Sequence, residues 1–348
     1  MEINSILVTG ATGFIGAHIV DALLARGLRV RGATRSPAKG AAMLKARPQY
    51  ADRLEFVQID DFEKPGGLAD AVRGVDGIIH TASLFTYDTT NNETELIIPA
   101  INGVKAVFEA AASATNPVAI KRIVLTSSFA SVIDVARNAQ TPLAPYFTYT
   151  GSDWNPLSYE EAAAPTTSAV VAYRGSKKFA ERAAWEFITE KKPAFDLVAL
   201  CPPMTFGPVV HPVDSVEKLN ESNAMLWKVA SGEALPVARV PFWIDVRDLA
   251  EAHVNALLKE EVGGKRYTPT APERFSYGLA ADIIKGEFEG LKGKVSGESQ
   301  DVDESYGLDG GSAGRELAFQ YRGFRETVRD LVQQALEMQR VEKAGAAI

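Results

Sequence analysis

Ile6-Leu7-Val8-Thr9-Gly10-Ala11-Thr12-Gly13-Phe14-Ile15-Gly16 is the stretch that decides the fold. Its apolar start has the length of a buried strand, and the apolar residues beyond the three glycines recur at helical spacing as far as Gly27. Glycines allow a sharp turn, close approach of the backbone to a pyrophosphate and tight helix packing. The stretch therefore predicts a dinucleotide site at a helix N-terminus, where free N–H groups and the helix dipole attract an anion. The predicted cofactor contacts in it are Gly10, Thr12, Gly13, Phe14, Ile15 and Gly16. A glycine-rich turn that binds nothing remains the alternative, because this spacing alone is a weak signal.

The end of the second predicted strand, residues 28–34, indicates which dinucleotide binds. Enzymes selective for NAD place an acidic residue there for the ribose 2′-hydroxyl, whereas a basic residue accommodates a 2′-phosphate. Here Arg35 follows the strand, and Lys39 lies one turn further. We therefore predict NADP(H), with Arg35 across the 2′-phosphate and adenine. The alternative is that Arg35 is an ordinary solvated arginine.

Further strands are predicted at residues 54–59, 75–82, 122–128 and 195–200, with helical segments between them. A strand and helix that alternate about every 30 residues predict an α/β, Rossmann-type doubly wound parallel sheet. Ligands bind beyond the carboxyl ends of such strands. The candidates at those ends are Asp61, Thr81, Ala82, Ser128, Pro202 and Met204. Asp61 could accept from the adenine amino group or cap a helix, and the prolines at 202 and 203 would form a rigid wall for the nicotinamide.

A helix predicted over residues 172–185 carries Tyr173 and Lys177. Residues four apart lie on one helix face, about 6 Å apart along its axis. An ammonium near a phenol favours the phenolate and lowers a pKa that is otherwise about 10, so the tyrosine becomes a usable proton donor. Such pairs are common by chance, and this one gains weight from its place after a dinucleotide unit.

The remaining chain predicts a second lobe. Residues 1–205, with a contribution from 240–260, form the predicted dinucleotide-binding domain; 206–239 and 261–314 form a substrate lobe; 315–348 form a closing helix. Residues 133–168 are expected to be a long loop over the strand ends, and 286–314 an exposed loop. Aromatic and sulfur side chains could line a substrate pocket or belong to the core: Phe85, Phe129, Trp154, Phe206, Met225, Trp227 and Trp243.

Composition limits the function classes. The 348 residues are 46% hydrophobic with a net charge of −7, so no basic surface for nucleic acid or an anionic membrane is expected. An acidic start and a first apolar run of three residues predict a cytoplasmic protein without a signal segment. One cysteine, Cys201, and four scattered histidines offer no metal site, and His80 is interpreted as a packed, hydrogen-bonded histidine.

These motifs, in this order, resemble the extended short-chain dehydrogenases/reductases. The shared features are the glycine loop, Ser128, Tyr173-x-x-x-Lys177 and the stretch 242–250. Within that family the chain resembles dihydroflavonol reductase-like carbonyl reductases, and most of all the fungal NADPH-dependent methylglyoxal and ketone reductases. Arg35 and the segments 153–156, 173–181 and 185–187 carry the closer similarity.

The resemblance implies a catalytic triad of Ser128, Tyr173 and Lys177. In the implied reaction NADPH reduces a ketone or aldehyde, Ser128 and Tyr173 hydrogen-bond the carbonyl oxygen, and Tyr173 donates a proton while Lys177 anchors the nicotinamide ribose. The alternatives are an NAD(P)-dependent epimerase or dehydratase of a sugar-like substrate and a non-catalytic NADPH-binding regulator. Phe129 follows Ser128 where the related dehydratases carry an acid. The expected partner is a small carbonyl compound, and the expected state is a monomer or homodimer.

Overall fold

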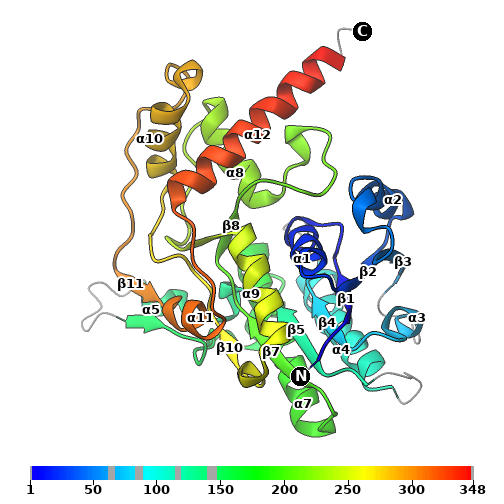
Figure 1. The fold of residues 1–348 in the computed structure, drawn as a ribbon. Helices are drawn as coiled ribbons and strands as arrows, with labels where there is room; N and C mark the ends of the chain where they lie inside the picture. Colours follow the sequence, from blue (N-terminus) through cyan, green and yellow to red (C-terminus); the bar gives the residue numbers. More distant parts are fainter. Residues whose placement is uncertain (1, 62–66, 83–88, 114–118, 139–146, 346–348) are drawn as a thin grey trace.

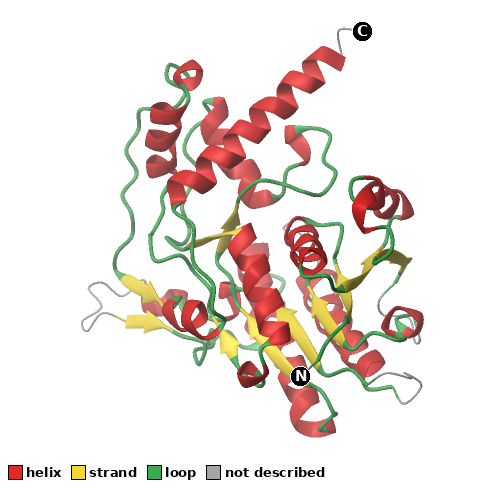
Figure 2. Ribbon diagram, viewed as in Figure 1, coloured by secondary structure: helices red, strands yellow, loops and turns green. Residues whose placement is uncertain are grey.

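The central feature of the computed structural model is a seven-stranded parallel sheet (Figures 1 and 2). The structure describes residues 2–61, 67–82, 89–113, 119–138 and 147–345. The strands follow the order β10-β7-β5-β4-β1-β2-β3. Their bounds are β1 Ser5–Thr9, β2 Arg29–Thr34, β3 Leu54–Gln58, β4 Gly77–His80, β5 Arg122–Thr126, β7 Asp196–Leu200 and β10 Arg266–Tyr267. This order confirms the predicted doubly wound sheet, because β2 and β3 are added on one side of β1, and β4, β5, β7 and β10 on the other.

Alternating side chains of β1 divide the core between the two faces of the sheet. Ile6 and Val8 face a layer that contains α1 (Phe14–Ala25) and α9 (Val246–Leu258). Leu7 faces the opposite layer, which contains α4 (Ile98–Ala111) and α7 (Ala169–Lys191). The β-strand period of two explains why neighbouring residues serve different layers. Shorter helices accompany the edge strands: α2 Pro37–Lys45 and α3 Ala69–Val72.

The second lobe lies beside the sheet and has its own aromatic core. β8 (Met204–Phe206) pairs with β9 (Trp243–Asp245), and α8 (Glu221–Ser231), α10 (Tyr277–Glu287) and α12 (Phe324–Gly345) pack around them. Figure 1 shows α12 crossing this lobe and projecting beyond it. The short single-turn elements are η1 Pro48–Tyr50, η2 Glu93–Ile97 with π geometry, η3 Phe129–Ser131, η4 Val216–Lys218, η5 Glu260–Val262 and η6 Glu289–Leu291.

Two segments expected to be loops contain regular structure. The first holds α5 (Val135–Asn138), β6 (Phe147–Tyr149) and α6 (Tyr159–Ala163), while its residues 139–146 lie outside the described part of the chain. β6 pairs in parallel with β11 (Tyr306–Leu308), from the second supposed loop. The loop predictions were wrong there because each strand is too short for a periodic signal and is stabilised by a partner distant in sequence.

The closing helix also differs from its prediction, which started it at residue 315. α11 (Gly311–Glu316) ends before Ala318, whose φ of 55° is left-handed, and α12 begins only at Phe324. Leu317 and Phe319, between the helices, pack into the core cluster that contains α9. Burial of these two side chains therefore breaks a pattern that is helical by periodicity alone.

Candidate active site

The glycine loop joins β1 to α1 in the geometry that a phosphate needs. Gly10 has a φ of 69°, and Gly13 N–H donates to its carbonyl oxygen at 2.9 Å. A Cβ on Gly16 would lie 2.2 Å from that same oxygen, so only glycine allows the contact between helix and turn. No side chain caps the N-terminus of α1. The loop therefore presents an uncapped helix N-terminus at the carboxyl edge of the sheet.

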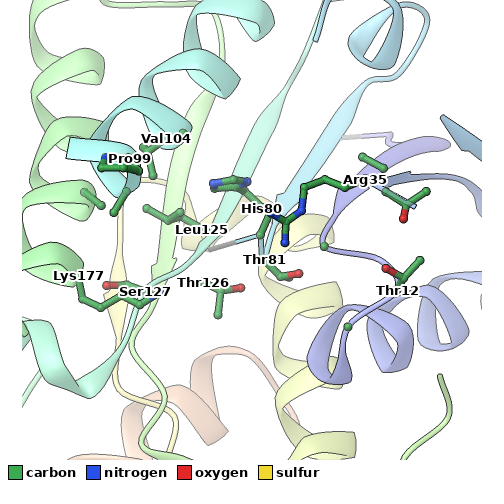
Figure 3. Close-up of a pocket in the computed structure, with 18 of the residues that line it drawn as sticks. Thr12, Arg35, His80, Thr81, Pro99, Val104, Leu125, Thr126, Ser127 and Lys177 are labelled. Atoms are coloured by element: carbon green, nitrogen blue, oxygen red, sulfur yellow. The ribbon is translucent and has the colours of Figure 1, made fainter. Parts of the chain in front are cut away.

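A cavity of about 420 Å³ lies along this edge (Figure 3). It is lined by nine of the residues that the sequence singled out: Gly10, Thr12, Gly13, Arg35, Lys39, Asp61, Thr81, Ala82 and Lys177. These residues come from five different segments of the chain, and the parallel sheet brings them together. The volume of the cavity is that of an ordinary small-molecule pocket.

Seven other predicted site residues do not line this cavity: Phe14, Ile15, Gly16, Ser128, Tyr173, Pro202 and Met204. Phe14 and Gly16 are buried behind the glycine loop. Met204 is half-buried and packs against the core of the second lobe. Pro202 accepts a hydrogen bond at 2.9 Å from the N–H of Phe129, so it lies against the turn that contains Ser128.

Basic groups lie at the end of the cavity that faces β2. Arg35 and Lys39 are both exposed there, on either side of the start of α2. Ser36 caps that helix, with its hydroxyl accepting from the Lys39 N–H at 3.4 Å. Asp61 lines the cavity as well, and the N-cap of α3 is Leu68. Two cations at this end suit a phosphate better than a bare ribose hydroxyl.

Lys177 lies at the opposite end of the cavity, on α7. Its Nζ is 5.7 Å from the centroid of the Tyr173 ring, one helical turn earlier. The Lys177 side chain is half-buried, and desolvation lowers its pKa from 10.5 to about 8. An ammonium with this pKa is still charged at neutral pH and loses its proton more readily than an exposed lysine.

Ser128 follows β5 and caps the single turn η3. Its hydroxyl oxygen accepts from the N–H of Ala130 at 3.1 Å. The backbone on either side is tied to the end of β7, since Ser127 N–H donates to the Leu200 carbonyl at 2.7 Å and Phe129 N–H donates to Pro202. The turn is therefore held at the same sheet edge as the cavity.

His80 is packed and hydrogen-bonded, as the sequence predicted, and Cys201 is buried. His80 is 3% exposed and its Nδ1 lies 2.7 Å from the Thr9 hydroxyl. Burial, with a smaller contribution from the Lys177 charge, lowers the pKa of His80 to about 4. Burial raises the pKa of the Cys201 thiol to about 12. Both groups are therefore uncharged near neutral pH.

The sequence interpretation missed Glu181 and Ser127, which both line the cavity. Glu181 is 1% exposed, forms a 2.6 Å ion pair with Arg266, and accepts from the hydroxyls of Ser127 at 2.5 Å and Ser131 at 2.8 Å. Burial alone would raise the pKa of Glu181, but the Arg266 charge and these hydrogen bonds hold it below its ordinary value. Its position four residues after Lys177 could have indicated it; no local pattern points to Arg266.

The aromatic residues considered for a substrate wall have different roles. Phe129, Phe206 and Trp243 are core residues, at most 2% exposed. Met225 and Trp227 are half-buried and pack on the second lobe, and Trp154 lies beneath the Arg266 guanidinium, 3.9 Å from it. Phe85 lies outside the described residues.

The described part of the chain has neither a metal-binding cluster nor a membrane-spanning helix. No group of three or more His, Cys, Asp or Glu side chains there could hold a metal ion. None of the helices in the described ranges is long and apolar enough to cross a bilayer.

Comparison with known proteins agrees with this geometry and confirms the predicted resemblance to fungal reductases. The chain is 37% identical to a putative uncharacterized oxidoreductase of Schizosaccharomyces pombe, over 95% of this chain and 97% of that one. It is 36% identical to ketoreductase azaE of Aspergillus niger, over 96% and 98%. Yeast methylglyoxal/isovaleraldehyde reductase Gre2 complexed with NADPH matches at a TM-score of 0.85 and 32% identity, over 96% and 99% of the two chains. Residues 6–268 match the NAD dependent epimerase/dehydratase family, and the chain belongs to that family.

Proposed function

We propose that this protein uses NADPH to reduce a ketone or aldehyde to an alcohol. The observation that carries the proposal is the cavity that runs from Arg35 and Lys39, past the glycine loop, to Lys177 on α7. One end suits a phosphorylated ribose and the other carries the lysine of a Tyr/Lys pair. Relatives named ketoreductase and methylglyoxal reductase, one of them complexed with NADPH, support the same reaction.

The residues present fit NADPH. The uncapped N-terminus of α1 and the glycine loop would hold the pyrophosphate, Arg35 and Lys39 the 2′-phosphate, and Asp61, Thr81 and Ala82 the adenosine side. Pro202 and Met204 are proposed as the wall on the nicotinamide side. When bound, NADPH supplies the hydride that reduces the carbonyl carbon.

Each member of the proposed triad has one task. Ser128 and Tyr173 donate hydrogen bonds to the carbonyl oxygen as it gains negative charge. Tyr173 then gives its phenolic proton to that oxygen as a general acid. Lys177 stabilises the resulting phenolate through its charge and would bind the ribose hydroxyls.

Net reduction suits the site better than sugar dehydration. A dehydratase needs an acidic group beside the catalytic hydroxyl to expel water, and the next residue after Ser128 is Phe129, which is 2% exposed in the core. A non-catalytic NADPH-binding regulator is disfavoured because both Tyr173 and Lys177 are retained. A cytoplasmic location and a monomeric or homodimeric state stay predictions of the sequence.

The test is NADPH consumption by wild type and Tyr173→Phe across aliphatic, aromatic and α-dicarbonyl compounds. Losing a general acid is expected to lower kcat by about 10²- to 10⁴-fold while the Kd for NADPH stays unchanged. Tyr321→Phe is the control, because it removes a hydroxyl that donates to the Gly310 carbonyl at 2.7 Å and does not line the cavity. Full turnover by Tyr173→Phe would contradict the role of Tyr173, and wild type that consumes no NADPH with any carbonyl would contradict the reaction.

A further inference from the structure

Asn155 lies in the segment 153–156, whose sequence resembles the fungal reductases and to which the reaction above gives no task. The residue is 3% exposed. Its side-chain Nδ2 donates to two backbone carbonyls, that of Ala130 at 2.7 Å and that of Arg174 at 3.2 Å. Its own N–H donates to the Ser131 carbonyl at 2.9 Å. One buried residue thus donates three hydrogen bonds, to carbonyls in two other segments of the chain.

Those carbonyls lie beside the two hydroxyls of the proposed triad. Ala130 is two residues after Ser128 in the turn η3, and Arg174 follows Tyr173 on α7. Ser128 and Tyr173 are 45 residues apart in sequence. The Asn155 amide therefore ties the serine turn directly to the helix turn that carries the tyrosine.

The orientation of this amide follows from its surroundings. Both neighbours of Nδ2 are carbonyl oxygens, so a flipped amide would place oxygen against oxygen. The Oδ1 atom has no hydrogen-bond partner among the described residues. Burying an unpaired oxygen lowers stability, so an amide at this place is poorly explained by packing alone. Its contribution is the pair of hydrogen bonds that Nδ2 donates.

The segment that carries Asn155 is itself anchored. Arg266 donates to the Gly151 carbonyl at 3.1 Å and to the Asp153 carbonyl, and it lies over the Trp154 ring. The same guanidinium pairs with Glu181 of α7 and donates to the Ser131 hydroxyl at 2.9 Å. The segment that carries Asn155 is consequently held, through Arg266, to both the turn η3 and the helix α7.

We infer that Asn155 is a positioning residue that sets the separation of the Ser128 and Tyr173 hydroxyls. The inference rests on the proposed function, since it assumes that these two hydroxyls bind one substrate oxygen. A shift of about 1 Å between such groups can lower a rate by about 10²-fold. Loss of the Nδ2 hydrogen bonds frees the serine turn to move relative to α7.

The first experiment measures Asn155→Ala. We expect kcat to fall by about 10- to 100-fold with little change in the Kd for NADPH. In a Ser128→Ala background the same substitution is expected to cost less than about threefold, because the separation no longer matters once the serine hydroxyl is gone. Additive losses in the double variant, or unchanged kcat in the single one, would overturn the inference. Asn255→Ala is the matched control, since its Nδ2 donates to the Leu317 carbonyl at 2.8 Å, remote from the triad.

A second measurement separates this inference from the reaction itself. Hydrogen exchange at residues 127–132 and 172–176 is expected to accelerate in Asn155→Ala and to stay unchanged in Asn255→Ala, whether or not any carbonyl is reduced. Unchanged exchange there would overturn the tether even with an active enzyme, whereas inactive wild type with accelerated exchange would overturn only the reaction. If Asn155→Ala does not fold, Asn155→Ser takes its place, because a serine is too short to reach both carbonyls, and the same outcomes decide.

Discussion

Replacing Lys177 with methionine is expected to stabilise the ligand-free fold while removing turnover. The Lys177 ammonium is desolvated beside the cavity, and its pKa falls from 10.5 to about 8. At about 1.4 kcal/mol for each pKa unit, this fall corresponds to roughly 3 kcal/mol of unfavourable charge burial. Because the side chain is half-buried and water in the cavity screens it, we expect a gain of about 1–2 kcal/mol in the free energy of unfolding.

The pH dependence of this gain has a definite sign. At pH 7 the ammonium is charged in both the folded and the unfolded chain, so wild type bears the full cost of burying it. Above about pH 8 the folded lysine loses its proton while the unfolded one, with a pKa of about 10.4, keeps it. The folded state then gains stability with rising pH, and the advantage of Lys177→Met shrinks between about pH 8 and 10.

Urea unfolding of wild type and Lys177→Met, at about pH 7 and about pH 9.5, measures both effects. Lys178→Met is the matched control: burial lowers the pKa of this neighbouring ammonium as well, but it donates to the Leu157 carbonyl at 2.6 Å, and the loss of that hydrogen bond should offset the gain in stability. A Lys177→Met variant no more stable than wild type at pH 7, or an advantage that grows with pH, would refute the reasoning.

Three other substitutions test the rest of the site. Arg35→Glu is expected to weaken NADPH binding by at least about tenfold relative to NADH; an unchanged ratio of the two Kd values would show that Arg35 does not contact the 2′-phosphate. Gly16→Ala places a Cβ 2.2 Å from the Gly10 carbonyl oxygen; it should cost about 1–3 kcal/mol in urea unfolding and weaken NADPH binding, and neutral behaviour would contradict the packing argument. Glu181→Gln leaves the buried Arg266 without its carboxylate, for an expected loss of about 3–5 kcal/mol. Since the folded pKa of Glu181 is depressed, its contribution in wild type is present above about pH 4 and lost below it, so the gap between the two proteins should close in acid.

Features that depend on a few adjacent residues were predicted well. The glycine loop shows itself in eleven consecutive residues because the strand, the turn and the start of the helix are adjacent in sequence, and Gly13 and Gly16 contact the Gly10 carbonyl oxygen within that unit. Ser36 and Pro37, the N-cap and first residue of α2, are equally local features. The parallel sheet followed because strand and helix alternate along the chain, which leaves few topologies open.

Features that depend on distant partners were not predictable in the same way. β6 and β11 are three residues each and exist because they pair with one another across more than 150 residues of chain. The break before α12 depends on Leu317 and Phe319 entering a core formed by strands of the central sheet, α1 and α9. Neither the pairing of β6 with β11 nor the break before α12 changes the hydrophobic periodicity of its own segment, and the prediction of these segments depended on that periodicity.

The polar groups around the proposed triad include both local and distant features. Tyr173, Lys177 and Glu181 are spaced four apart on α7, so helix geometry alone places them along one face. Asn155 and Arg266 contact that helix from other segments: Asn155 donates to a backbone carbonyl of α7 and Arg266 to the Glu181 carboxylate. The residues next to Asn155 and Arg266 in the sequence do not predict these contacts. A serine and a tyrosine on separate elements can cooperate only if their separation varies by less than about 1 Å, and packing of apolar side chains does not specify direction that finely. Directional hydrogen bonds do, which explains why Ser131, Asn155, Glu181 and Arg266 form a polar cluster between the turn after β5 and α7.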